Sequence, residues 1–169
     1  MTEPHIRAVP PAGLPATLVD SSVLLDILTD DPAWAQWSGD ALARARDDGR
    51  LVLSPIVYAE VSVGFDRVED LDEAVPEAEF EREPLPYAAG FLAGKAFLAY
   101  RKRGGQRRSP LPDFYIGAHA AICGYRLLTR DIVRYRSYFS ALELIAPDQG
   151  PAGYGRLHPL LVRTSQRVP

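Results

Sequence analysis

The sequence predicts an α/β domain in which a parallel sheet lies buried between two layers of helices. Its strand-like apolar runs are short and do not alternate with polar residues, as at 51–53 and 127–129. Segments with the apolar spacing of helices separate these runs. Strands without alternation are typical of parallel sheets covered on both faces. The length of 169 residues, 47% of them hydrophobic and 24% charged, suits one globular domain.

The first half of the chain is predicted to contain two strands and four helices. Ser21 or Ser22 is a suitable N-cap for the helix that follows the first strand. Ser54 and Pro55 form an N-cap and first-turn pair at the start of another helix. The expected elements are a strand at 17–19, helices at 23–28 and 34–46, a strand at 51–53, a helix from residue 55, and a short helix at 69–78.

The second half is predicted to contain three helices and two strands. A long helix at 87–103 is ended by two glycines, and a helix at 113–123 is stopped by Gly124. A strand at 127–129, a short helix at 132–138 and a last strand at 142–145 follow. The residues alone therefore indicate four strands.

Proline placement sets the expected domain limits. Four of the fifteen prolines lie in 1–15, four lie in 147–169, and seven lie between. Proline removes a backbone donor, so neither end is expected to seed a fold. We expect a Pro-rich N-terminal extension at 1–15, the folded domain at 16–146 and a Pro/Gly-rich C-terminal tail at 147–169.

Composition excludes several classes of protein. No apolar run is long enough to span a bilayer, and no secretory signal is visible, so a cytoplasmic protein is expected. The single cysteine, Cys123, excludes a disulfide framework and a site built from several cysteines. The net charge of −3 indicates no particular partner.

Four acidic residues occupy positions where parallel sheets bind ligands. Asp20 follows the first strand directly, and Asp131 follows the strand at 127–129 after one residue. Glu60 lies on an otherwise apolar helix, and Asp113 begins another helix that is almost free of charge. Ligands bind beyond the carboxyl ends of such strands, so neighbouring strands would direct Asp20 and Asp131 into one crevice.

A divalent cation would relieve the cost of gathering these acids. An unpaired buried carboxylate is unfavourable by several kcal/mol, and pooled carboxylates repel one another. Oxygen-rich sites suit hard ions, Mg²⁺ or Mn²⁺. We expect Asp20, Glu60 and Asp113 to hold the principal ion, with Asp131 completing its shell through water or holding a second ion.

Each acid also has a plain structural interpretation. Asp20 and Asp131 are suitable N-caps, and Asp113 is a first-turn acid favoured by the helix dipole. Glu60 would then pair with an arginine. Taken singly these interpretations are preferred, and only the coincidence of the four acids favours a shared site.

Four motifs in register resemble those of PIN-domain ribonucleases, in particular VapC-type toxins of bacterial toxin–antitoxin pairs. The similar stretches are 18–28, which contains Asp20; 54–65, which contains Glu60; 112–120, which contains Asp113; and 127–139, which contains Asp131. The resemblance covers 17–146. Four motifs in the right order are far more specific than one.

The resemblance implies a three-layer α/β/α domain with a five-stranded parallel sheet in the order 3-2-1-4-5. It implies a Mg²⁺- or Mn²⁺-dependent endoribonuclease whose catalytic and metal-binding acids are Asp20, Glu60, Asp113 and Asp131. Ser22 and Thr129 match supporting positions. It also implies a homodimer and a cognate antitoxin, which docks on apolar helices and sends a basic side chain to the acids.

The charge distribution favours an RNA substrate. Residues 95–108 carry six basic side chains and no acid, and four arginines lie between 126 and 136. Arg107, Arg108 and Arg130 are the candidate substrate-binding residues. Helix C-termini also favour basic residues, which explains 101–103 equally well. The nine acids in 66–83 are interpreted as an exposed face.

Other polar and aromatic residues have structural interpretations. Asp26 is expected to be a surface acid, and His119 is expected to be a core or surface histidine. Cys123 is treated as a small hydrophobe. Trp34 and Trp37 are expected to form a packing stripe or part of a partner groove.

Two other functions compete with a nuclease. One is a PIN-like RNA-binding module without turnover, against which four intact acids argue. The other is a haloacid-dehalogenase-like phosphatase, since Asp20 ends a first strand. That class needs a second acid where this chain has Ser22, and a lysine where it has Arg126 and Arg130.

Overall fold

A computed structural model describes residues 13–148, which form a five-stranded sheet with seven helices. All strand pairs are parallel and their order is β3-β2-β1-β4-β5, which confirms the predicted fold. Most of the N-terminal extension expected at 1–15 and of the tail expected at 147–169 lies outside the described residues. The strands are β1 (Ala16–Val19), β2 (Arg50–Leu53), β3 (Phe80–Arg82), β4 (Arg126–Leu128) and β5 (Leu144–Ile145).

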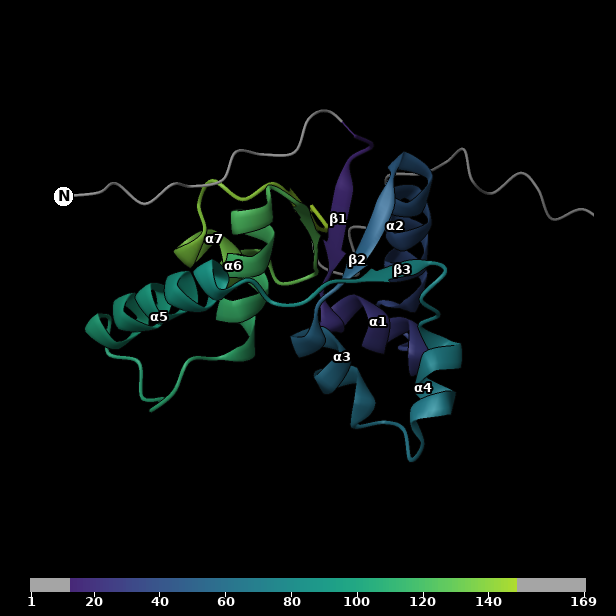
Figure 1. Cartoon of the computed structure of the whole chain (residues 1–169), viewed down its shortest axis with the longest axis horizontal. Coiled ribbons are helices and arrows are strands. Elements are labelled where there is room, and N and C mark those ends of the chain that lie inside the picture. Colours follow the sequence, from purple (N-terminus) through teal and green to yellow (C-terminus); the bar gives the residue numbers. More distant parts are fainter. Residues whose placement is uncertain (1–12, 149–169) are drawn as a thin grey trace, which may run out of the picture.

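The helices form the two outer layers of the domain. Figure 1 shows α5, α6 and α7 grouped to one side of β1, and α1 to α4 grouped to the other. Helix α1 packs on α2 and α3, and α6 packs on α5, α7 and β4. The helices are α1 (Ser21–Leu28), α2 (Ala35–Asp48), α3 (Pro55–Ser62), α4 (Val68–Ala74), α5 (Tyr87–Lys102), α6 (Pro112–Cys123) and α7 (Ile132–Tyr138). Among the described helices, none is long and apolar enough to cross a membrane.

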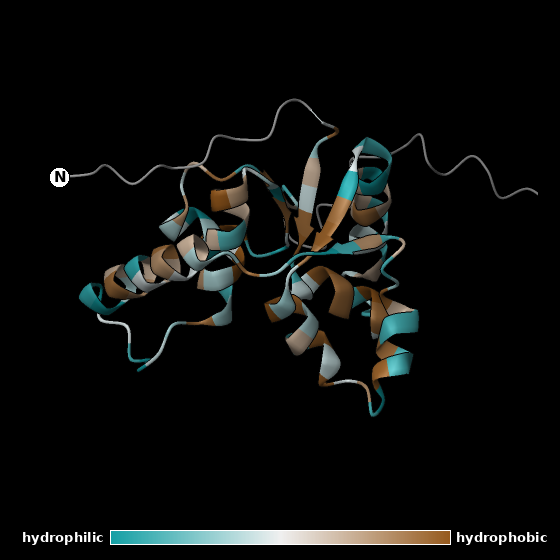
Figure 2. Ribbon diagram, in the orientation of Figure 1, coloured by the Kyte–Doolittle hydropathy of each residue, from teal (hydrophilic) through white to brown (hydrophobic). Residues whose placement is uncertain are grey.

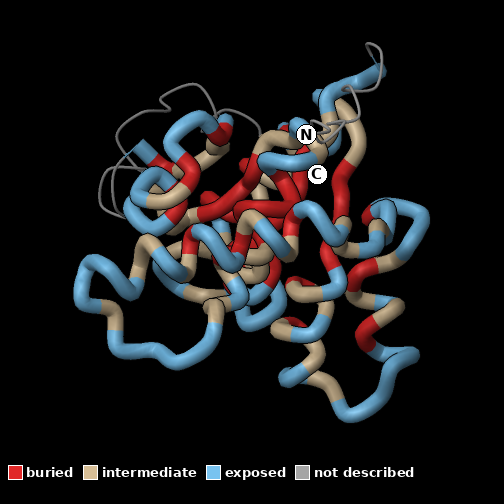
Figure 3. Tube along the Cα trace, turned by 60° about the vertical axis from the view of Figure 1, so that its left-hand side comes forward, coloured by how far each residue is buried: buried red, intermediate tan, exposed pale blue. Residues whose placement is uncertain are grey.

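The centre of the sheet is buried on both faces. Leu18 and Val19 are both fully buried, as are Leu127 and Leu128. Consecutive strand residues point to opposite faces, so both faces of β1 and β4 must be covered. Figure 2 shows hydrophobic colouring at the carboxyl end of β1, and Figure 3 shows the buried residues gathered at the centre of the domain. Apolar and polar residues do not alternate in these strands because both faces of the sheet are covered, as predicted.

The strand β3 is the element that the residue pattern did not indicate. It lies within the acidic stretch 66–83, and only Phe80 of its three residues is buried. A three-residue edge strand buries too little apolar surface to leave a periodic signal. The helix expected at 69–78 ends earlier, at Ala74, because Pro76 cannot continue it. The last strand comprises only 144–145, since Leu142 lies in a turn and donates its backbone N–H to Phe139.

Candidate functional site

The candidate site lies at the carboxyl ends of β1 and β4. Val19 is paired with Leu128, and the backbone N–H of Asp20 donates to the Leu128 carbonyl at 2.9 Å. The two strands are therefore neighbours, as predicted. Asp20 leaves the end of β1, and Thr129 and Asp131 follow the end of β4. The sheet thus brings residues more than 100 positions apart to one edge.

Asp20 is held in a fixed position by three hydroxyl groups. Its side chain is buried, Oδ2 accepts from Ser22 Oγ at 2.8 Å and Thr129 Oγ1 at 2.7 Å, and Oδ1 accepts from Tyr135 at 3.2 Å. Asp20 is the residue before α1 but makes no side-chain cap, so the capping interpretation is wrong. Burial raises the pKa of Asp20 and the charge of Asp113 raises it further, whereas the three hydrogen bonds oppose the shift.

Glu60 contributes a carboxylate oxygen that lacks a hydrogen bond within the described part of the chain. It lies on α3, which begins at Pro55 and is capped by the Ser54 side chain. Its Oε2 atom is buried and has no partner there. Burial raises the pKa of Glu60, a hydrogen bond from Ser21 opposes this, and the charges of Asp113 and Asp20 raise it further. The expected pairing with an arginine takes the form of a favourable charge interaction with Arg134, not a direct bond.

Arg134 joins the other two acids. Its Nη1 atom forms an ion pair with Asp113 Oδ2, and its Nε atom lies 3.4 Å from Asp131 Oδ2. Asp113 occupies the first turn of α6, immediately after Pro112. Asp131 Oδ1 accepts from the Arg134 backbone N–H at 3.1 Å and so caps α7, as one interpretation predicted. The Asp131 N–H in turn donates to Thr129 Oγ1 at 3.0 Å.

The structure therefore brings the four predicted acids together in two groups. Asp20, Glu60 and Asp113 lie close enough to affect one another's electrostatics. Asp131 is connected to them through Arg134 and Thr129. Both residues predicted to support the site, Ser22 and Thr129, donate to Asp20.

The three arginines predicted to bind substrate lie in different surroundings. Arg107 lines a cavity of about 510 Å³ together with Asp131 and Arg134. Arg108 is exposed in the same loop and is not among the residues lining that cavity. Arg130 lies 3.0 Å from Asp26 and over the ring of Trp34.

Comparison with known proteins settles the family. The family model of the PIN domain matches residues 17–138. This chain belongs to the PIN domain family. PIN domains are typically nucleases. A search of the curated proteins finds no match.

Solved structures similar to this PIN domain are toxin–antitoxin structures. VapBC2 from Rickettsia felis, bound to a DNA fragment from its promoter, has a TM-score of 0.61 and 17% identity over 79% of this chain and 99% of that one. VapBC-1 from nontypeable Haemophilus influenzae has a TM-score of 0.58 and 18% identity, covering 78% and 97%. DNA-bound VapBC from Salmonella typhimurium has a TM-score of 0.55 and 14% identity, covering 79% and 98%. At these identities the likeness shows the fold.

The donor set of this PIN domain fits a hard divalent cation. Its candidate ligands are all carboxylate oxygens, which Mg²⁺ and Mn²⁺ prefer. The unpartnered Oε2 of Glu60 and the mutual repulsion of the acids are the costs that such an ion would relieve. Arg134 supplies the positive charge at Asp113 and Asp131 in the structure described.

Sequence reasoning missed three residues around the site. Asp26 was expected at the surface, but it is buried and accepts from Ser38 at 2.8 Å and from Arg130. Its spacing of three from buried Val23 was the available signal. Arg134 was counted only as a basic charge, although it lies three residues after Asp131. Tyr135, fully buried beside Asp20, gave no signal beyond its place on a predicted helix.

Proposed function

We propose that this PIN domain is the toxin of a type II toxin–antitoxin pair. Its activity is the hydrolysis of RNA phosphodiester bonds by a Mg²⁺- or Mn²⁺-dependent endoribonuclease. A cognate antitoxin inhibits it. The observation that carries the proposal is the group of carboxylates near the ends of β1 and β4, in which one Glu60 oxygen has no hydrogen-bond partner among residues 13–148.

The four acids have different roles in the proposed metal site. Asp20, Glu60 and Asp113 are the residues that hold the principal ion, and Asp131 completes its shell through water or holds a second ion. When bound, a divalent ion supplies an activated water and neutralises charge on the phosphate. Asp20 is oriented for this by Ser22 and Thr129, which fix one of its oxygens. Fixed ligands are needed because metal sites tolerate little misplacement.

Basic residues around the acids support an RNA substrate. Arg107 lines the same cavity as Asp131, which supports a role for Arg107 in binding a phosphate next to the metal. Arg108 extends the same loop into solvent. Arg130 is paired with Asp26, and we propose it as a second phosphate contact.

The proposed partners follow from the structural neighbours. Those are complexes of a toxin with its antitoxin, which supports an antitoxin for this chain. We propose a homodimer in the cytoplasm, where RNA substrates are available. The Asp113 and Asp131 carboxylates, already paired with Arg134, are the place where a basic antitoxin side chain would bind.

A cleavage assay tests the nuclease. Full-length protein is incubated with total RNA in Mg²⁺, in Mn²⁺ and in EDTA. Asp113→Asn and Glu60→Gln are compared with Glu77→Gln, which alters an exposed carboxylate between α4 and β3. Cleavage is expected in either metal and with Glu77→Gln, and not in EDTA or with the two site variants. Cleavage that persists in EDTA, or in both site variants, would refute the mechanism.

Two further measurements test the antitoxin proposal and the competing RNA-binding function. Co-expression of the adjacently encoded small protein is expected to relieve growth arrest, and arrest that persists contradicts the antitoxin proposal. RNA that is bound but never cut, in either metal, would favour the RNA-binding module.

A further inference from the structure

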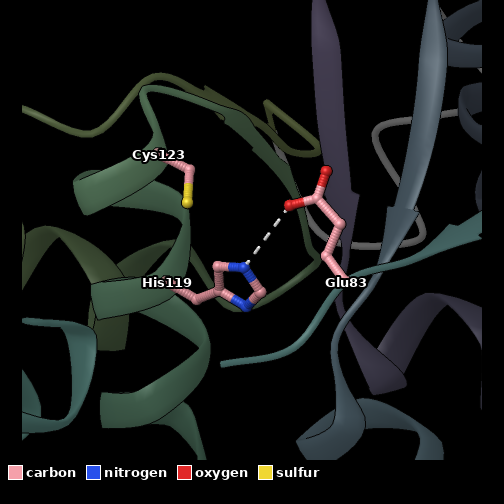
Figure 4. Close-up of side chains that lie close together, drawn as sticks. All are labelled: Glu83, His119 and Cys123. Carbon is pink, nitrogen blue, oxygen red and sulfur yellow. Dashed lines mark ion pairs between the residues drawn. The ribbon is translucent and has the colours of Figure 1, made fainter. Parts of the chain in front are cut away.

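A second cluster of metal-ligating side chains lies away from the four acids. Glu83 follows the end of β3, and His119 and Cys123 lie four residues apart on α6. One ligand atom from each residue lies within 4.8 Å of the other two. Figure 4 shows the His119 ring facing the Glu83 carboxylate, with the Cys123 sulfur one turn further along the helix.

The two ring nitrogens of His119 are buried without hydrogen-bond partners among the described residues. The side chain is fully buried, and within residues 13–148 neither ring nitrogen has a hydrogen-bond partner. Glu83 Oε2 lies 3.9 Å from Nε2, too far for a hydrogen bond. Buried polar groups without partners are rare in folded proteins and unfavourable. A metal ion between Nε2 and Oε2 would give the ring nitrogen a partner.

We propose that Glu83, His119 and Cys123 bind a transition-metal ion of the Zn²⁺ type. Zinc takes histidine nitrogen and carboxylate oxygen at about 2.1 Å and cysteine sulfur at about 2.3 Å. Two ligand atoms at about 2.1 Å in a tetrahedron are about 3.4 Å apart. The observed 3.9 Å between Nε2 and Oε2 therefore closes by a small side-chain movement. Binding releases the thiol proton of Cys123 to solvent.

Neighbouring side chains hold the Glu83 carboxylate in a fixed orientation. Tyr125 donates to its two oxygens at 2.9 and 2.7 Å, and Arg50 Nη1 lies 3.0 Å from Oε1. Arg50 holds Oε1, the Tyr125 hydroxyl lies between the two oxygens, and Oε2 also faces His119. Carboxylate ligands of metals are commonly fixed by such outer contacts. A fourth position remains for water.

The ligand types separate this cluster from the four acids. Sulfur and imidazole ligands select Zn²⁺ over Mg²⁺, whereas carboxylates alone favour the hard ions. Asp113 and His119 are six residues apart on α6, about 9 Å along the helix axis. A metal here would tie the end of edge strand β3 to the helix that carries Asp113. Its role is structural, and it does not depend on the nuclease proposal.

Cobalt substitution tests the site through the Cys123 sulfur. Full-length, untagged protein is stripped with EDTA, returned to excess Mg²⁺ and titrated with Co²⁺ and then Zn²⁺. We expect one equivalent of Co²⁺ with a thiolate charge-transfer band in the near ultraviolet. Zn²⁺ should displace it and raise the melting temperature.

Matched variants locate the bound ion. Cys123→Ser is expected to lose the charge-transfer band and to weaken Zn²⁺ binding at least about 100-fold, and Tyr125→Phe about tenfold. His5→Gln combined with His158→Gln removes the other histidines of the chain and should bind like wild type. Glu60→Gln should also keep the band. Co²⁺ binding without a thiolate band would overturn the proposal. A Cys123→Ser variant that binds Zn²⁺ as wild type does would also overturn the proposal. In that case a water molecule would bridge Glu83 and His119.

Discussion

The hydroxyl of Thr129 connects Asp20, which follows β1, with Asp131, which follows β4. It donates to Asp20 Oδ2 at 2.7 Å and accepts the backbone N–H of Asp131 at 3.0 Å. Thr129→Val keeps the shape of the side chain and removes both bonds. We therefore expect the substitution to destabilise the fold and to weaken metal binding together.

The expected magnitude follows from the two lost bonds. A hydrogen bond to a charged group contributes about 1.5–3 kcal/mol, and a half-buried N–H left without a partner costs about 1 kcal/mol. The free energy of unfolding should fall by about 2–4 kcal/mol, a large part of the stability of a domain of this size. Mg²⁺ affinity should fall about tenfold, because Asp20 loses one of the bonds that orient it.

Thr17→Val is the matched control. Thr17 is also a fully buried threonine, but it pairs with Arg126 at the start of β4, and its hydroxyl accepts from Arg126 Nε at 3.2 Å. Arg126 keeps its ion pair with Asp48 when that bond is lost. We expect a loss of about 1 kcal/mol and unchanged Mg²⁺ affinity.

Urea denaturation in EDTA measures stability, and calorimetric titration measures Mg²⁺ affinity. Both variants are compared with wild type at neutral pH. The reasoning is refuted if Thr129→Val is no less stable than Thr17→Val, or if it binds Mg²⁺ as wild type does.

Three further changes test other parts of the fold and site. Gly49→Ala places a Cβ 1.9 Å from the Pro15 carbonyl oxygen and should lower the free energy of unfolding by more than about 1 kcal/mol. Gly39→Ala adds its Cβ in open space on α2 and should raise that free energy by about 0.5–1 kcal/mol, as measured by thermal unfolding. Arg134→Gln removes the cation that competes for the acids, so calorimetry should show Mg²⁺ affinity rising up to about fivefold; unchanged or weaker binding would contradict this. Burial raises the pKa of Asp26 above its ordinary 3.8, so the stability of wild type relative to Asp26→Asn should decline as the pH rises through that raised pKa, and a flat difference in urea titrations would count against it.

The sequence was sufficient to predict the central part of the fold. Leu18-Val19 and Leu127-Leu128 could be recognised as strands because their burial on both faces leaves a continuous apolar run. The edge strand β3 could not, because two of its three residues are exposed and charged. It entered the prediction only through the family resemblance.

The acids of the site were predictable, whereas their partners were not. Asp20 and Asp131 follow strands, so their position along the chain implies a position at the sheet edge. The partners of these acids depend on how helices pack. Tyr135 reaches Asp20 only because α7 folds back onto the end of β1, and no local pattern encodes that contact. Asp26 was misjudged for the same reason, since Ser38 covers it from the neighbouring helix α2.

The two sides of the acidic site differ in how firmly they are held, and this difference has a functional consequence. Asp20 is fixed by three neutral hydroxyls, and those of Thr129 and Tyr135 are buried, so they cannot be exchanged without disturbing the core. Asp113 and Asp131 are held by Arg134, whose side chain is 49% exposed and whose ion pairs contribute little in water. We therefore expect an incoming cation to displace Arg134 rather than a hydroxyl. On the proposed function, a metal ion and a basic side chain of a partner would compete for the same exchangeable side of the site, so partner binding and metal binding should oppose each other.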